Sequence, residues 1–337
     1  MNQLHNAFTL FLSLLVEAMP FLLLGVLLSG LLLLWIDEGK LISAMPKNPI
    51  LGAFVGSCAG FLFPVCECGN VPVARRLLMQ GVPAPVAVGF LLAAPTINPI
   101  VIWSTWVAFR DQPEIVVLRV VFSLSIATII ASVFSVQSNL KPLLQPAIAC
   151  AIPQMQTQGA QEDDTPTLLK SGTFWLGQPQ PIMSAVGVSG GGMMGQSITS
   201  KPLPFKLRMF LDNTVQELRE LGGVLILGSA IAAAIQVLAP RELILSLGQG
   251  PITSILAMMG LAALVSICST VDSFFALSFA TTFTSGSLLA FLVFGPMIDL
   301  KGIGLMLSIF KPRAVFYLFG LAAQLTFIMT LLYTYFF

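Results

Sequence analysis

Charge is scarce in this 337-residue chain, because only 9% of its residues are Asp, Glu, Lys or Arg. A soluble domain usually carries about 25%. The formal net charge of +1 gives no reason to expect nucleic acid as a partner. With 56% hydrophobic residues, a chain so poor in charge could not hide its apolar surface from water. The composition therefore excludes an ordinary soluble protein.

The patterns of several enzyme and cofactor classes are missing as well. The chain has one histidine, His5, and five cysteines in an odd number without the spacing of a disulfide framework. No Gly-rich loop ends in Gly-Lys-Ser/Thr, so ATP coupling within this chain is not indicated. No basic segment precedes the first apolar run, which argues against a signal peptide. We predict that the protein is not an enzyme and has no catalytic residue, cofactor or resident metal.

Long apolar runs are what the chain has in abundance. Residues 7–35 contain a single charge, Glu17, and residues 221–239 contain none. A helix that crosses a bilayer needs about 20 mainly apolar residues, and three further runs (121–136, 252–271 and 314–337) have the same character. The sequence therefore predicts an all-α polytopic membrane protein whose surroundings are the lipid bilayer.

The composition divides the chain into three parts. Residues 138–207 are rich in Gly, Pro, Gln, Ser and Thr, which is typical of a flexible linker. The linker separates an N-terminal membrane repeat, 1–137, from a C-terminal one, 208–337. Residues recur between these halves at offsets of 203 to 201, in the pairs Glu17/Glu220, Gly25/Gly228, Cys66/Cys268, Asn70/Asp272, Pro95/Pro296 and Asn98/Asp299. Such an ordered series predicts an internal duplication.

Each half contains about five apolar segments. We place them at 7–35, 50–65, 71–93, 97–110 and 116–137, and at 213–239, 251–268, 271–294, 298–311 and 313–337. An odd number of spans per half predicts repeats that are inverted in the membrane. If some segments are re-entrant, the count falls from ten spans to eight. Lys and Arg placement favours a cytoplasmic linker, with Arg110, Arg119 and Arg241 on the opposite side.

Polar residues interrupt the apolar segments at four related places. Asn70 and Asn98 are followed closely by Pro72 and Pro99, which predicts that one helix stops and another begins at each Asn. The second half offers Thr270, Asp272 and Asp299 at the matching positions, and Pro95 and Pro296 are expected to interrupt the preceding helices. Irregular backbone at membrane depth is tolerated only inside the protein or along a cavity. Paired breaks of this kind indicate a transporter binding site.

Thiols and acids lie within these breaks. In the stretch "FPVCECGNVPVARR", an extended backbone would point Cys66 and Cys68 the same way, with Cys268 as a third sulfur from the other repeat. Arg75 and Arg76 could either favour thiolates or mark a membrane boundary. Ionisable groups inside apolar runs are costly and usually functional, so Glu17, Glu67 and Asp272 are candidates for proton coupling.

The stretches "FPVCECGNVPVARRLLMQG", "GFLLAAPTINPIV" and "GSLLAFLVFGPMIDLKG" resemble the predicted-permease family that includes bacterial organoarsenical (methylarsenite) efflux permeases. The resemblance covers about residues 10–135 and 210–335. It implies a multi-pass permease of the cell inner (plasma) membrane, with arsenical resistance as a function of some members. Glu67 stands where the family commonly has a small residue. The resemblance implies that Cys66, Cys68, Asn98, Cys268 and Asp299 line a cavity.

These observations predict a secondary transporter that exports a small, soft or thiol-reactive solute such as a trivalent organoarsenical. A metal ion or a sulfur compound is an alternative substrate, and a channel and a membrane thiol oxidoreductase are alternative classes. A homo-oligomer is compatible with the sequence. The predicted substrate-binding residues are Cys66, Glu67, Cys68, Asn70, Pro95, Asn98, Cys268, Thr270, Asp272 and Asp299.

Overall fold

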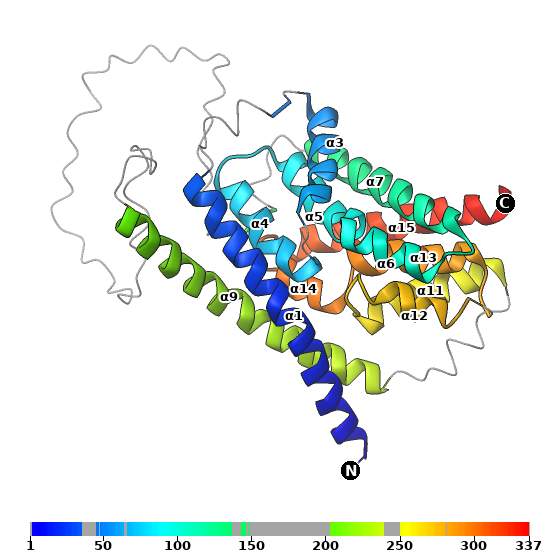
Figure 1. Ribbon diagram of the computed structural model, residues 1–337. Coiled ribbons are helices and arrows are strands. Elements are labelled where there is room, and N and C mark those ends of the chain that lie inside the picture. Colours follow the sequence, from blue (N-terminus) through cyan, green and yellow to red (C-terminus); the bar gives the residue numbers. More distant parts are fainter. Residues whose placement is uncertain are drawn as a thin grey trace.

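The computed structural model describes residues 2–35, 45–46, 48–63, 66–136, 143–145, 148, 203–238, 250–280 and 282–336. Regular structure in these ranges is helical (Figure 1), apart from one isolated bridge between Leu144 and Phe310. The helices of the first half are α1 (Asn2–Trp35), α3 (Pro49–Ala59), η1 (Gly60–Leu62), α4 (Glu67–Met79), α5 (Ala84–Ile97), α6 (Pro99–Ala108) and α7 (Pro113–Val136). Those of the second half are α9 (Leu203–Leu238), α11 (Pro251–Val265), α12 (Asp272–Leu277), α13 (Ser285–Met297), α14 (Leu300–Met306) and α15 (Pro312–Phe336).

Six apolar stretches are long enough to cross a membrane. They are His5–Leu31, Ala84–Ala108, Pro113–Ser135, Phe210–Val237, Ser285–Met306 and Pro312–Phe336. Two shorter apolar helices cover Pro49–Leu62 and Pro251–Val265. The described residues therefore form a multi-pass helical membrane protein with six candidate spans, against the eight to ten predicted. Two of the six are broken: α5 gives way to α6 at Asn98, and α13 to α14 at Ile298 and Asp299.

The prediction of one apolar segment over residues 71–93 is wrong, because this range covers parts of two helices. Helix α4 ends at Met79, and the chain turns through Gly81, whose φ of 81° lies in the left-handed region that glycine adopts without strain. Pro83 then occupies the N-cap position of α5. The preceding prediction, a segment at 50–65, corresponds to α3 and η1.

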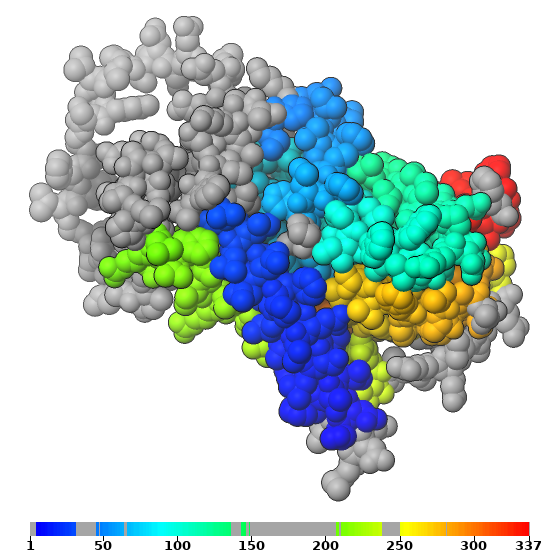
Figure 2. All heavy atoms as spheres, in the orientation of Figure 1, coloured from blue at the N-terminus to red at the C-terminus, as the bar shows by residue number. Residues whose placement is uncertain are grey.

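Two long helices form one flank of the molecule. Helices α1 and α9 pack along each other, and Figure 1 shows them as the blue and green rods beside the other helices. In the space-filling view α1 runs along the near surface (Figure 2). On the inner side α1 packs against α4, and α9 packs against α14. These two short helices therefore lie between the flank and the rest of the bundle.

The other helices form two similar groups. Helices α3, α5 and α7 pack on one another, and so do α11, α13 and α15. Gly56 on α3 and Gly60 at the start of η1 allow a close approach to α5, since a Cβ at Gly60 would lie 2.6 Å from the Ala94 Cα. A Cβ at Gly56 would overlap the Val86 backbone. Each group thus wraps a buried central helix, α5 or α13.

A short part of the predicted linker pairs with the second half. The Gln145 N–H donates to the Ile309 carbonyl at 2.9 Å, and the Lys311 N–H donates to the Leu143 carbonyl at 2.8 Å. Leu144 and Ile148 are buried. Apart from residues 143–145, 148 and 203–207, the segment 138–207 lies outside the described residues.

Candidate functional site

Two cysteine carbonyls accept the same pair of backbone hydrogen bonds, from the third and fourth residues that follow. The Cys66 carbonyl accepts from the Gly69 and Asn70 N–H groups, both at 3.1 Å. The Cys268 carbonyl accepts in the same way from the N–H groups of Val271 and Asp272, at 2.9 and 3.0 Å. Cys66 is the N-cap residue of α4, whereas Cys268 begins a turn that leads into α12, whose own N-cap residue is Val271. The two cysteines therefore share this hydrogen-bond pattern at the carbonyl but not their distance from the helix start.

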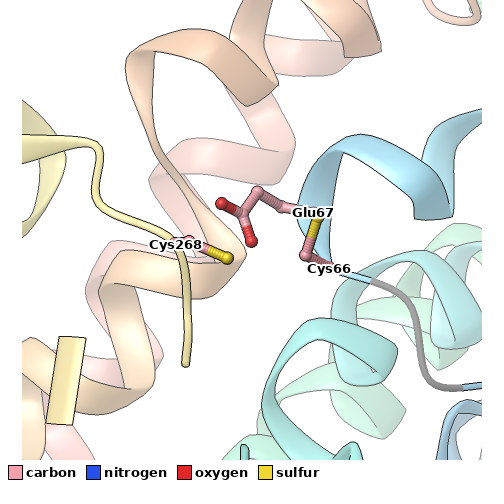
Figure 3. Close-up of side chains that lie close together, drawn as sticks. All are labelled: Cys66, Glu67 and Cys268. Atoms are coloured by element: carbon pink, nitrogen blue, oxygen red, sulfur yellow. The ribbon is translucent and has the colours of Figure 1, made fainter. Parts of the chain in front are cut away.

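The two thiols and one carboxylate meet inside the protein. One ligand atom from each of Cys66, Glu67 and Cys268 lies within 4.8 Å of the others (Figure 3). All three side chains are buried. The donors come from both halves of the chain, because Cys66 and Glu67 begin α4 whereas Cys268 lies between α11 and α12. Two sulfurs and one carboxylate oxygen at this spacing can surround a single small, soft ligand.

Cys68 lies outside that three-donor group. The extended backbone predicted for this stretch is not found, because Glu67 is the first residue of α4 and Cys68 the second. Side chains two positions apart on a helix point in different directions, unlike those on an extended strand, which agrees with the position of Cys68 outside the group. Cys68 is nevertheless buried, and its thiol interacts with that of Cys66.

The predicted caps at the two broken spans are confirmed. The Asn98 side chain accepts from the Ile100 N–H at 2.9 Å, and Pro99 takes the first position of α6. The Asp299 Oδ1 accepts from the Gly302 N–H at 2.6 Å at the start of α14. Pro95 and Pro296 do not interrupt their helices as predicted, since both lie inside α5 or α13. The breaks come at the polar residues because these can satisfy the N–H groups of a new helix.

Asn70 and Thr270 do not cap helices. Asn70 lies within α4 and donates from Nδ2 to the Leu91 carbonyl of α5 at 2.6 Å. The Thr270 hydroxyl donates to the Cys268 sulfur at 3.6 Å, so it contacts the three-donor group directly. Helix α12 has no side-chain cap. Asp272, at its first position, has a different partner.

Asp272 forms a buried ion pair with Arg119 of α7. The two guanidinium nitrogens donate to Oδ1 at 3.2 Å and to Oδ2 at 2.7 Å. Arg119 also donates to the hydroxyls of Thr105 and Ser273, at 2.7 and 2.9 Å. The pair therefore joins α12 to α6 and α7, across the two halves of the chain. Arg119 was predicted only as a charge on the side opposite the linker, and its role in an ion pair was not; its side chain is 1% exposed and lies within the candidate span Pro113–Ser135.

A second buried cation lies near the three-donor group. Lys301, in the first turn of α14, is among the largest fully buried side chains. It interacts electrostatically with Asp299, Cys68, Glu67 and Glu17. Glu17 is half-buried on α1. The Glu67 Oε2 and the Asp299 Oδ2 have no hydrogen-bond partner among the described residues.

Arg75 and Arg76 are remote from the thiols along α4. Eight residues separate Glu67 from Arg75, which is about 12 Å of helix at 1.5 Å per residue. Arg75 instead pairs with Glu220 of α9 at 2.9 Å. Glu217, close by on α9, accepts from the Ser29 hydroxyl at 3.0 and 3.3 Å. Arg75 therefore joins α4 to the flank rather than acts on Cys66.

Sequence reasoning missed the roles of both buried cations. A lysine two residues after a helix-capping acid looks like a boundary charge, and so does an arginine seven residues into an apolar helix. The available signal was that Lys301 follows Asp299 within a run otherwise free of charge. A cation at such a place costs free energy unless acidic groups surround it.

Comparison with known proteins places these features in a family. The family described as "Predicted permease" matches residues 3–335. The chain is 38% identical over 310 residues to the UPF0718 protein YcgR of Bacillus subtilis, which covers 92% of this chain and 90% of that protein. It is 30% identical over 323 residues to a putative two-component membrane permease complex subunit of Streptococcus mutans, covering 96% and 93%. No solved structure matches.

Proposed function

The chain belongs to the predicted-permease family, and on this premise we propose that it is a secondary transporter that exports a small thiol-reactive solute across the inner membrane. The observation that carries the proposal is the buried group of Cys66, Glu67 and Cys268. Soft ions and trivalent arsenic favour sulfur ligands. The solute classes that fit are therefore trivalent organoarsenicals and soft metal cations.

We further infer that the two halves are inverted repeats around this group. The packing of α4 on α14 has a counterpart in the packing of α12 on α6, in which each helix is replaced by its equivalent from the other half. The carbonyls of Cys66 and Cys268 also accept the same pair of backbone hydrogen bonds ahead of α4 and α12. Transporters with inverted repeats expose a central site to one side and then the other by moving one repeat against the other.

Proton coupling follows from the chemistry of the thiols. A divalent cation that binds two cysteine thiols as thiolates releases their two protons. Protons and cation then compete for the same sulfur atoms, so an inward proton gradient can drive the solute outward. Glu67 can take part because its carboxylate belongs to the same group, whereas Asp272 is engaged by Arg119. Glu17 remains a candidate through its interaction with Lys301.

Binding of thiol reagents by the purified protein tests the proposal. We expect Cd²⁺ and phenylarsine oxide each to bind at one equivalent, and Cys66→Ser or Cys268→Ser to weaken both by about a hundredfold or more, since half of the sulfur donors is lost. Cys58→Ser is the matched control, because this half-buried cysteine on α3 lies outside the group. Calorimetry on protein in lipid nanodiscs gives the affinities, and proteoliposomes give transport.

An unchanged affinity in Cys66→Ser and Cys268→Ser would refute the thiol site. A Cys68→Ser variant distinguishes between the two possible partners of Cys66. The sequence pattern pairs Cys66 with Cys68, whereas the three-donor group pairs Cys66 with Cys268. We therefore expect a smaller loss of affinity in Cys68→Ser than in Cys268→Ser.

A partner subunit is a second component of the proposal. The Streptococcus mutans relative is named as one subunit of a two-component permease complex. By similarity, we infer that this chain also works with a second protein. Affinity purification from the native membrane, followed by mass spectrometry, tests this inference; recovery of the chain alone would contradict it.

A further inference from the structure

The junction of α6 with α12 exposes large apolar side chains. The two helices pack on each other and lie toward the viewer in Figures 1 and 2. Their exposed side chains are Trp103 and Trp106 of α6 and Val271, Phe274 and Leu277 at α12, and Trp103 is 70% exposed. We define these five residues as the α6–α12 face.

Two long helices cover the corresponding junction of α4 with α14. Helix α1 packs on α4 and α9 packs on α14, and every residue of α4 and α14 is buried or half-buried. The contacts are close, because a Cβ at Gly25 of α1 would overlap the Gly69 backbone of α4. A Cβ at Gly304 of α14 would lie 3.2 Å from the side chain of Val224 on α9. The flank thus covers one junction, and the α6–α12 face is the uncovered part of the other.

A helix break lies beside the exposed side chains. Apolar side chains alone could face lipid, but the candidate span Ala84–Ala108 is interrupted at Asn98, and the next two residues, Pro99 and Ile100, are exposed. At the matching break, the two residues after Asp299 are half-buried and buried. Irregular backbone at membrane depth is tolerated where protein covers it or where it lines a water-filled cavity, and not against lipid. A protein cover is therefore expected over the α6–α12 face.

The sizes of the side chains indicate what kind of surface covers this face. In the register of the predicted duplication, Val271 stands at the place of Gly69, and Trp103 stands at the place of Gly304. The two glycines lie at the contacts with α1 and α9, whereas Val271 and Trp103 are bulky and exposed. Helices in lipid pack closely where one of them offers small residues. We therefore expect the covering helix to present small residues of its own, which a second α6–α12 face does not.

A hollow beside α6 offers a place for one larger side chain. Its volume is about 350 Å³, and its lining residues are Phe61, Pro99, Ile102, Trp103 and Trp106. Aromatic side chains, and Trp in particular, are enriched among the residues that anchor protein interfaces. The hollow and the exposed aromatic residues are therefore suited to a protein partner.

We propose that the α6–α12 face binds a transmembrane helix of the second protein with which this permease works. The inference rests on the partner subunit in the proposed function and names its docking surface. Small residues of the partner helix pack against Trp103 and Phe274, and a larger side chain enters the hollow beside Trp106. The partner then covers the break at Asn98, as α9 covers the second part of the other broken span.

Photo-crosslinking from single positions in native membranes tests this surface. The photoreactive residue p-benzoylphenylalanine replaces Trp103, Phe274 or, as the matched control, Phe316, an exposed aromatic residue of α15 outside the face. We expect the first two positions to form a covalent adduct with one and the same membrane protein, and the control position to react with lipid. An adduct between two copies of this chain would overturn the proposal. Protein adducts of equal yield at the control position, or none at the first two, would also overturn it.

Alanine variants then measure what the face contributes. The crosslinked protein, identified by mass spectrometry, is co-expressed with this chain in a host that lacks both. We expect the double variant Trp103→Ala, Phe274→Ala to lower the recovery of the complex about tenfold or more, because anchor residues dominate the affinity of an interface. Phe316→Ala should leave recovery unchanged, and equal recovery in the two variants would overturn the proposal.

The outcomes separate this inference from the proposed function. If affinity purification recovers no second protein at all, the proposed partner subunit fails. If a second protein is recovered but crosslinks only from positions outside the α6–α12 face, the docking surface alone is refuted. Each crosslinking variant changes one exposed side chain, so the test stays decisive if the double alanine variant does not fold.

Discussion

The junction of α4 with α14 and the junction of α12 with α6 share a backbone plan but differ in their charges. In each, a short helix that a cysteine precedes in the chain packs against the second part of a broken span from the other half. At the junction of α12 with α6, Asp272 and Arg119 form a closed, buried ion pair. At the junction of α4 with α14, Glu67, Asp299 and Lys301 are buried and interact without such a pair.

The difference indicates that the two junctions have different roles. A closed ion pair with two hydroxyl partners has most of its hydrogen bonds satisfied, so it suits a fixed contact between the halves. A cluster with unpartnered carboxylate oxygens has spare capacity and suits a ligand. Because Asp272 donates its backbone N–H to the Cys268 carbonyl at 3.0 Å, the ion pair also fixes the position of one thiol.

We expect the largest effect on stability from a substitution that breaks the Arg119–Asp272 ion pair. Arg119→Gln leaves Asp272 buried without its counter-charge, and we expect the free energy of unfolding to fall by about 3–5 kcal/mol. Thermal unfolding in detergent, followed by tryptophan fluorescence, measures this. Glu220→Gln is the control, because it breaks the Arg75–Glu220 ion pair, in which the Glu220 side chain is 45% exposed. This exposed pair should contribute about 0–1 kcal/mol to the free energy of unfolding. Equal losses in the two variants would contradict the assigned role.

The next largest effect is expected to differ between two glycines that the predicted duplication pairs, Gly25 and Gly228. A Cβ at Gly25 of α1 would overlap the Gly69 backbone of α4, whereas one at Gly228 of α9 would lie 3.5 Å from the Lys301 Cα. We therefore expect Gly25→Ala to destabilise the protein by about 1–3 kcal/mol and Gly228→Ala to be nearly neutral. The same unfolding assay compares them. A loss in Gly228→Ala as large as that in Gly25→Ala would show that the two contacts are equally tight.

The smallest effect concerns the two helix caps. Asn98→Ala and Asp299→Ala each remove a cap and should cost about 1 kcal/mol. Asp299→Asn keeps the cap but removes the charge beside Lys301. It should therefore stay near the parent in stability while weakening Cd²⁺ binding. If Asp299→Asn bound Cd²⁺ like the parent, the acid would serve the helix alone.

The sequence predicts the places of the breaks better than the partners across them. Asn98 and Asp299 could be assigned as caps because capping depends on neighbouring residues in the chain. The partner of Cys66 could not be found locally, because Cys68 entered a helix and Cys268 came from the other half. The pair of Arg119 with Asp272 spans 153 residues. Such contacts follow from helix packing, which the spacing of residues within one segment does not specify.

The positions of the two thiols in the chain bear on how such a site could arise. Cys66 and Cys268 belong to opposite halves of the chain, so one half alone supplies only one of the two thiols. A protein made of a single such half could assemble the sulfur pair only by meeting a second copy in the opposite orientation, with identical thiols facing across the axis. If the halves arose by the proposed duplication, their union in one chain allows the two sides to differ. Cys66 lies beside the acid Glu67, and Cys268 accepts a hydrogen bond from the Thr270 hydroxyl.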